Sequence, residues 1–203
     1  QNSNISIIYK IFGDVTESLS KKNPGDTAEL LGPIGNTFTK WDSDVFPILI
    51  GGGVGLAPIL NLKSQCDSAD IDYAIIIGAR NSSEQFIDHD PKNKIYLSTD
   101  DGSLGEKGTV MVPLEKIIKE HQNPYLFACG PEPMLQAIHD IALNEKIPTQ
   151  LSVESYMGCG IGLCQGCVIS KNTNSIKEHS YHEQYSLVCL DGPVYEAKDI
   201  NFD

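Results

Sequence analysis

The sequence predicts an α/β fold with additional β structure, in three parts: a truncated β-barrel, a doubly wound parallel sheet and a small cysteine-rich domain. Three observations support this. Short β-prone runs between Gly/Pro turns occupy residues 1–43, and apolar runs alternate with helical patterns over 44–149. Residues 150–203 contain four of the six cysteines, from Cys159 to Cys189.

The net charge and the hydropathy of the sequence argue against a nucleic acid or a membrane as partner. The net charge of −12 argues against a nucleic-acid surface, because phosphate binding needs clustered Lys and Arg. No apolar run approaches the ~20 residues that span a bilayer, and the first ten residues do not resemble an export signal. We therefore expect no nucleic acid, no membrane and a cytoplasmic location.

The first part, 1–43, contains three short runs that favour strands: Ile5–Ile11, Thr27–Leu31 and Phe38–Trp41. They are separated by the turn-forming segments 23–26 and 32–36, as in a small barrel. The part is too short to close a barrel, and the sequence has no initiator Met. We therefore expect a further segment to precede this truncated barrel.

The second part, 44–149, alternates buried strands with amphipathic helices. Apolar runs typical of a parallel sheet are Val45–Ile50, Tyr73–Ile77, Ile95–Ser98 and Tyr125–Ala128. The helices between them show apolar residues at helical spacing, Leu114, Ile117 and Ile118 in one and Met134, Leu135, Ile138 and Ile141 in the other. This alternation predicts a doubly wound nucleotide-binding domain.

A glycine-rich loop, Gly51–Pro58, follows the first of these strands and precedes a helix. Such a unit places backbone amides and a helix N-terminus where a pyrophosphate can bind. The spacing is not the Rossmann fingerprint, since neither pair of glycines is followed by Gly or Ala three positions later. A tight structural turn is the alternative interpretation.

Three more residues are candidates by position. Cys129, before Gly130 and Pro131, ends a predicted strand, where ligands bind in doubly wound sheets; alternatively it is a small buried residue before a helix. Arg80 follows another predicted strand. It either contacts a ribose or phosphate of the nucleotide or is a solvated cation of the loop. Cys66, near a helix end, is interpreted as a core or surface residue.

The cysteines of the third part follow the pattern C-x4-C-x2-C with a distant fourth, at Cys159, Cys164, Cys167 and Cys189. Plant-type [2Fe–2S] proteins use this spacing. Their ligand loop turns tightly and directs N–H groups at the cluster, and here four glycines alternate with the cysteines. The spacing predicts a [2Fe–2S] site.

Two alternatives to the cluster remain open. A zinc site could use Cys164 and Cys167 with His179 and His182, although the histidines are too close for a classical finger and no recognition helix follows. Those histidines otherwise belong to a solvated loop over 171–183. Four unligated thiols are the other alternative, and an exposed loop would leave them open to oxidation.

Taken in order, these motifs resemble the electron-transfer subunit of class 1B dihydroorotate dehydrogenase, within the ferredoxin–NADP reductase-like superfamily. The resemblance covers essentially the whole chain. Its matching segments are Tyr9–Lys10 with Asp14–Ser20, Gly32–Phe38, Gly51–Pro58, Thr99–Ser103 with Gly105 and Gly108, Cys129–Met134, Glu154–Ser155 and Cys189–Val194.

The resemblance implies FAD held between the barrel and the nucleotide domain, NAD over the flavin, and a [2Fe–2S] cluster. It also implies an FMN-containing dihydroorotate dehydrogenase catalytic subunit as partner, in a heterotetramer, with electrons passing from FMN through the cluster and FAD to NAD⁺. Pyrimidine biosynthesis is the implied pathway. The implied FAD contacts are Ile8, Tyr9, Lys10, Val15 and Thr16, and the implied NAD contacts are Gly53, Val54, Gly55, Cys129 and Gly130.

Rival functions share much of this pattern. A diaphorase subunit of a hydrogenase, a sulfide dehydrogenase or a bifurcating transhydrogenase resembles the chain, but the latter two replace a cluster cysteine with Asp, whereas Cys159 is present. From another class, a zinc-stabilised binding module remains. The 21 residues between Cys167 and Cys189 predict a lengthened hairpin.

Overall fold

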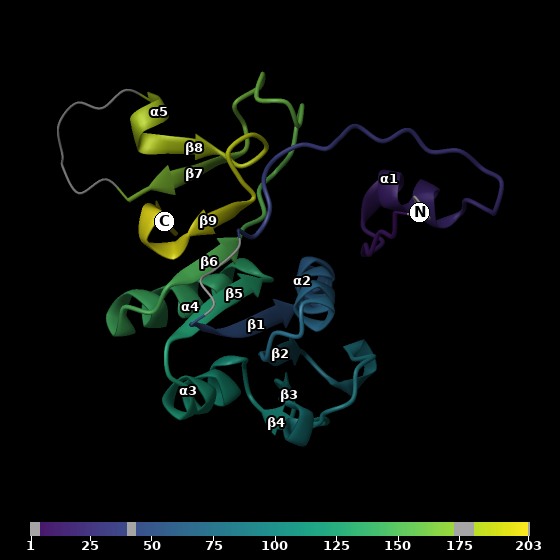
Figure 1. The fold of residues 1–203 in the computed structure, drawn as a ribbon. Helices are drawn as coiled ribbons and strands as arrows, with labels where there is room; N and C mark the ends of the chain where they lie inside the picture. The colour runs from purple at the N-terminus through teal and green to yellow at the C-terminus, as the bar shows by residue number, and fades with distance from the viewer. Residues whose placement is uncertain (1–4, 40–43, 173–180, 203) are drawn as a thin grey trace. The chain divides into compact units, whose positions relative to one another are not determined.

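The computed structural model describes residues 5–39, 44–172 and 181–202 (Figure 1). The chain divides into two compact units, Gln1–Pro33 and Ile34–Asp203, which are described separately. Within the described ranges, every helix is too short or too polar to cross a lipid bilayer.

The first unit contains one helix, α1 (Gly13–Ser20), and no strand among its described residues. The predicted strands Ile5–Ile11 and Thr27–Leu31 are therefore wrong, and of Phe38–Trp41 the described residues 38–39 are not in a strand. A strand needs a neighbouring strand for its hydrogen bonds, and no such neighbour is present in 5–39. The backbone hydrogen bonds of a helix are local, and at the start of α1 the Thr16 hydroxyl also accepts a hydrogen bond from the Phe12 N–H.

The second unit contains a seven-stranded sheet in the order β4-β3-β2-β1-β5-β6-β9. All neighbours are parallel except the last pair. All four predicted strands are confirmed. The bounds are β1 (Phe46–Gly52), β2 (Ala74–Ala79), β3 (Ile95–Thr99), β4 (Glu106–Lys107), β5 (Pro124–Cys129), β6 (Thr149–Ser152) and β9 (Val194–Glu196).

Helices cover both faces of this sheet, as a doubly wound fold requires (Figure 1). Alternate strand residues point to opposite faces, so Leu49 packs with α2 whereas Ile48 packs with α3 and α4. The predicted α/β fold is confirmed. The helices are α2 (Leu56–Ser68), α3 (Met111–Glu120) and α4 (Glu132–Glu145), with short 3-10 turns η1 (Gly53–Gly55), η2 (Ser82–Glu84) and η3 (Pro91–Asn93).

The C-terminal part forms a second, three-stranded antiparallel sheet in the order β10-β7-β8. Its β7–β8 pair confirms a hairpin between Cys167 and Cys189, although residues 173–180 of its connection lie outside the described residues. The elements are β7 (Val168–Lys171), α5 (Tyr181–Gln184), β8 (Tyr185–Leu187), η4 (Ala197–Asp199) and β10 (Ile200–Asn201).

The predicted division at 149/150 falls inside β6, which continues the parallel sheet. β9, from the C-terminal part, pairs with it. Buried residues of the cysteine-rich segment, Cys167 and Cys189 among them, belong to the same apolar cluster as α4. The division into 1–43, 44–149 and 150–203 stays a prediction.

Candidate iron–sulfur and nucleotide sites

The glycine-rich loop joins the carboxyl end of β1 to the first turn of α2. Gly53 has φ +56°, a left-handed conformation that costs little only for glycine, and a Cβ there would meet no atom within 4 Å. Val54 beside it is 44% exposed. An open loop with free backbone at a helix N-terminus suits an anionic group such as a pyrophosphate.

The loop lies directly against the end of β5. A Cβ on Gly55 would sit 2.4 Å from the Cys129 carbonyl oxygen, and one on Gly130 would sit 3.2 Å from the Gly52 nitrogen. The structure therefore brings all five predicted NAD contacts to one edge of the sheet, between the adjacent strands β1 and β5. Burial raises the pKa of the half-buried Cys129 thiol, which keeps it protonated near neutral pH.

A third loop reaches the same edge from β2. Arg80 pairs there with Glu84, a residue that the sequence analysis did not single out. The pair could have been predicted from the four-residue spacing of the two opposite charges. The 3-10 turn η2, which contains Glu84, is too short to be recognised by helical periodicity.

The predicted cluster ligands lie on two adjoining segments. The loop 158–167 turns through left-handed residues at Gly160, Gly162 and Gln165. The Cys164 N–H donates to the Cys159 sulfur at 3.3 Å, and the Cys189 N–H donates to the Cys167 sulfur at 3.5 Å. Cys167 and Cys189 are buried, Cys159 is partly buried and Cys164 is exposed.

The loop backbone favours a sulfur anion. N–H groups of Cys164 first, and then of Ile161, lower the pKa of the Cys159 thiol to about 6. The Cys189 thiol differs, because its hydrogen bond with Cys167 and its burial raise its pKa. Thiolates are what iron and zinc require as ligands.

The four cysteines form two hydrogen-bonded pairs. Among the described residues, no three His, Cys, Asp or Glu side chains converge as a metal-binding group. The donor set nevertheless fits a [2Fe–2S] cluster, since each of its two irons takes two thiolates. The loop N–H groups around Cys159 also fit a cluster whose sulfurs accept hydrogen bonds. His179 of the zinc alternative and the His182 side chain lie outside the described residues.

The cluster segment is anchored to residues near the start of the second unit. The Asn36 amide donates to the Asp191 and Val194 carbonyl oxygens, both at 2.8 Å, and its Oδ1 accepts from the Val194 N–H at 2.8 Å. The Asn36 N–H also donates to the Gly192 carbonyl. Segment 34–39 therefore fixes the chain just after Cys189.

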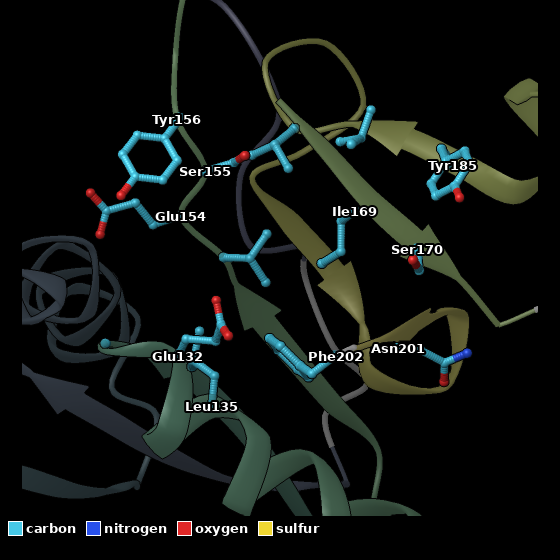
Figure 2. A pocket seen from close by; sticks show the side chains of 14 residues that line it. Glu132, Leu135, Glu154, Ser155, Tyr156, Ile169, Ser170, Tyr185, Asn201 and Phe202 are labelled. Carbon is cyan, nitrogen blue, oxygen red and sulfur yellow. The ribbon is translucent and has the colours of Figure 1, made fainter. Parts of the chain in front are cut away.

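A cavity of about 570 Å³ separates the end of β5 from the cluster hairpin (Figure 2). Glu132 on α4 and Glu154 after β6 line one side, together with Tyr156. Val168 and Val188 also line the cavity, and they are the chain neighbours of Cys167 and Cys189. This space therefore lies between the candidate nucleotide edge and the candidate cluster. Its volume is typical of small-molecule sites.

The predicted FAD contacts lie in the first unit and are not assembled into a pocket there. Ile8, Tyr9 and Lys10 are exposed in irregular chain, and Val15 is 83% exposed on α1. The Thr16 hydroxyl donates to the Phe12 carbonyl at 2.8 Å. These contacts stay a prediction.

The comparisons with known proteins agree with this geometry. The iron–sulfur cluster binding domain of dihydroorotate dehydrogenase B matches residues 154–201. The chain is 32% identical over 202 residues to the dihydroorotate dehydrogenase B (NAD(+)) electron transfer subunit of Caldanaerobacter subterraneus, covering 100% of this chain and 77% of the relative. The chain belongs to this family. The subunit of the same name from Fusobacterium nucleatum is 33% identical, with 98% and 75% covered.

A solved structure supports the same fold. A chain of the NADH-dependent reduced ferredoxin–NADP oxidoreductase, studied for flavin-based electron bifurcation, superposes with a TM-score of 0.78. It is 26% identical, and the match covers 96% of this chain and 68% of that one. The predicted ferredoxin–NADP reductase-like fold with a C-terminal iron–sulfur domain is therefore confirmed.

Proposed function

We propose that this protein is the electron-transfer subunit of a dihydroorotate dehydrogenase, and that it links a catalytic subunit to NAD⁺ through a [2Fe–2S] cluster and FAD. The observation that carries the proposal is the four-cysteine segment, which lies in residues matched by the family's iron–sulfur domain, within a chain that matches this family along its whole length. The partner would carry FMN, oxidise dihydroorotate for pyrimidine biosynthesis and form a heterotetramer with this chain.

When bound, a cluster exchanges single electrons, nicotinamide accepts a hydride, and a flavin interconverts the two. The protein positions these groups. Cys159, Cys164, Cys167 and Cys189 would hold the iron, while Gly53, Val54 and Gly55 would bind the pyrophosphate at the start of α2. Cys129 and Gly130 would frame the nicotinamide, and Gly130 also lines the cavity that the cluster hairpin borders.

FAD would contact Ile8, Tyr9, Lys10, Val15 and Thr16. This assignment is supported by the many apolar side chains exposed in the described part of the first unit, because exposed apolar groups favour a ligand or partner that removes them from water. They are Ile5, Ile7, Ile8, Tyr9, Ile11, Phe12, Val15, Leu30 and Leu31.

The catalytic subunit would dock over the cluster loop. Large apolar side chains surround the candidate ligands, with Tyr156 95% exposed and Leu163 79% exposed. Met157, Ile161 and Leu190 are exposed as well. Several exposed large apolar side chains within one segment are typical of protein interfaces. Four of the six cysteines would be cluster ligands, and ligand cysteines of this kind persist in a reducing compartment such as the cytoplasm.

A second function is favoured by the structural likeness to the bifurcating oxidoreductase. In that case the chain would serve a diaphorase, sulfide dehydrogenase or transhydrogenase instead of a dihydroorotate dehydrogenase. Identification of the co-purifying flavoprotein and of its substrate separates the two.

The test begins with anaerobic purification, followed by metal, sulfide and flavin analysis. We expect about two iron and two sulfide per chain, and Cys164→Ser should lose the visible absorbance of the cluster. Cys66→Ala is the matched control, since Cys66 lies buried in α2, outside the cysteine loop. Zinc without iron, or an unchanged spectrum in Cys164→Ser, would contradict the ligand assignment.

A further inference from the structure

The turn that carries Cys189 is closed twice by the residue that ends it. The Asp191 N–H donates to the Leu187 carbonyl at 2.8 Å, and in return the Leu187 N–H donates to Asp191 Oδ2 at 3.0 Å. The Leu190 N–H donates to the same carbonyl at 3.0 Å. Backbone and side chain together therefore fix the chain from Leu187 to Asp191, with Cys189 at the centre of this turn.

The closed turn holds Cys189 against Cys167. The Val188 N–H donates to the Cys167 carbonyl at 2.8 Å, and the Cys189 N–H donates to the Cys167 sulfur at 3.5 Å. Both donors belong to the turn that Asp191 closes. Hydrogen bonds behind a metal ligand orient it, so the carboxylate of Asp191 acts on the position of the Cys189 sulfur through the backbone of the turn.

A chain of hydrogen bonds continues from this carboxylate to the seven-stranded sheet. The Ser186 hydroxyl donates to Asp191 Oδ2 at 2.8 Å and accepts from the Tyr195 hydroxyl at 3.2 Å. Ser186 is 3% exposed, so its hydroxyl depends on these two partners for its hydrogen bonds. Tyr195 lies on β9, which pairs with β6 at the edge of the sheet. Asp191 therefore connects the turn of the fourth cysteine to the sheet that carries the nucleotide edge.

We propose that Asp191 is the positioning residue of the fourth cluster ligand: its carboxylate closes the turn that presents Cys189, and its negative charge lowers the reduction potential of the bound cluster. Reduction adds one negative charge to an iron–sulfur cluster, and a carboxylate two residues from a ligand disfavours that more negative state. The inference rests on the iron–sulfur site of the proposed function.

Two substitutions separate the turn from the charge. Asp191→Asn keeps an oxygen that can accept from Leu187 and Ser186 but removes the charge, whereas Asp191→Ala removes both. In the assembled complex, we expect Asp191→Ala to lose its visible cluster absorbance to an iron chelator about tenfold faster than wild type, since loss of a hydrogen bond behind a ligand typically weakens metal binding by about 10–100-fold. Asp191→Asn should release iron at a rate close to that of wild type, but its midpoint potential, from a dye-mediated titration followed by electron paramagnetic resonance, should be higher.

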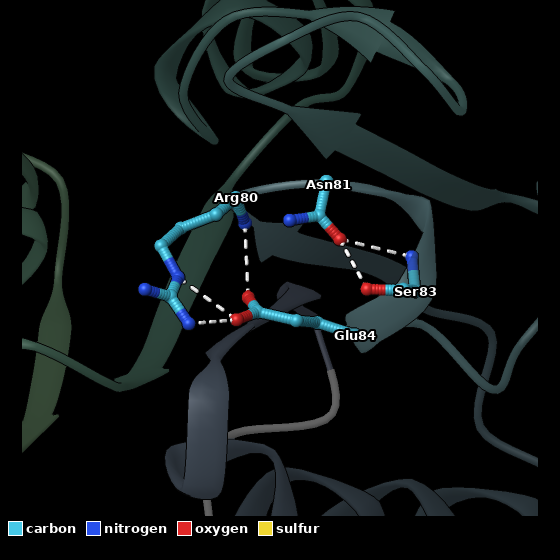
Figure 3. A network of polar contacts seen from close by, with 4 residues as sticks. All are labelled: Arg80, Asn81, Ser83 and Glu84. Atoms are coloured by element: carbon cyan, nitrogen blue, oxygen red, sulfur yellow. Dashed lines mark hydrogen bonds and ion pairs between the residues drawn. The ribbon is translucent and has the colours of Figure 1, made fainter.

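Asn81 and Asp101 provide matched controls outside the cysteine segment. Asn81 Oδ1 accepts from the Ser83 N–H at 3.0 Å and from the Ser83 hydroxyl at 2.6 Å (Figure 3), so Asn81→Ala opens a turn closed in the same way. Asp101 Oδ1 accepts from the Ser103 N–H at 2.9 Å and from its hydroxyl at 2.7 Å, so Asp101→Asn removes a carboxylate charge from the same arrangement. Both variants should keep the iron release and the potential of wild type.

An Asp191→Ala protein that releases iron at the wild-type rate, or an Asp191→Asn protein with the wild-type potential, would overturn the inference. If Asp191→Ala does not fold, the potential of Asp191→Asn decides alone. These measurements need neither nucleotide nor dihydroorotate. A wild-type complex that holds iron but does not reduce NAD⁺ would therefore contradict only the proposed function, whereas zinc in place of iron would overturn both.

Discussion

The contact between the glycine-rich loop and the end of β5 predicts a large effect for Gly55→Ala. The added Cβ would lie 2.4 Å from the Cys129 carbonyl oxygen, 2.5 Å from its carbonyl carbon and 2.6 Å from the Gly130 nitrogen. These are all backbone atoms, so no side chain can rotate away. The two loops must separate by about 1 Å to restore ordinary contact distances of ~3.5 Å.

The change in the free energy of unfolding caused by Gly55→Ala is the difference between a stabilising and a destabilising effect. Gly55 has φ −62° and ψ −10°, which alanine adopts readily, so the lower entropy of the unfolded chain favours alanine by about 0.5–1 kcal/mol. Overpacking of a rigid contact costs ~1–3 kcal/mol, and this site is at the upper end because only backbone can move. We expect a net loss of about 2 kcal/mol in the free energy of unfolding, measured by urea denaturation.

Gly53→Ala is the matched comparison, because it separates strain from packing. Its Cβ would meet no atom within 4 Å, but φ +56° is unfavourable for alanine by about 1–2 kcal/mol. Only Gly55→Ala should move the β5 loop, so only it should change the alkylation rate of Cys129. If Gly55→Ala is as stable as wild type, the close approach of the two loops is not a feature of the folded protein.

Two further predictions concern residues outside that contact. Burial raises the pKa of the Cys66 thiol from 9.0 to about 11, so the folded state binds the proton more tightly than the unfolded state. The free energy of unfolding should therefore fall as pH rises from about 9 toward 11, and Cys66→Ala should reduce this slope; an equal slope in both proteins contradicts the assignment. Asn36→Ala removes three 2.8 Å hydrogen bonds to Asp191 and Val194 and should cost about 2 kcal/mol in thermal unfolding, with faster amide exchange at Val194.

The central strands were predictable because each is a continuous apolar run buried on both faces. The run from Ile48 to Ile50 is fully buried between helices, so no alternation interrupts its signal. β6 was missed because Thr149, Gln150 and Ser152 are polar although buried. Gln150 is tolerated there because its amide donates to the Tyr125 hydroxyl at 3.1 Å and to Glu196 at 3.0 Å.

Local sequence was least informative where structure depends on distant partners. His139 on α4 follows Leu135 by four residues, on the buried face of the helix, and it is 6% exposed, with its Nε2 3.1 Å from the Ile200 carbonyl and its ring edge-on to Phe202. In the described part of the first unit, residues 5–33, β-prone residues form no strand, because propensity alone does not supply a pairing partner. Both features depend on tertiary partners that spacing does not encode.

The cysteine spacing was the strongest signal, because the chemistry itself restricts it. A loop that directs N–H groups at a ligand sulfur must turn within a few residues, which places glycines between the cysteines at fixed intervals. The fourth cysteine can lie far along the chain, since a hairpin returns it to the loop, as β7 and β8 return Cys189 beside Cys167. The length of that hairpin is therefore free to vary, whereas the spacing from Cys159 to Cys167 is not.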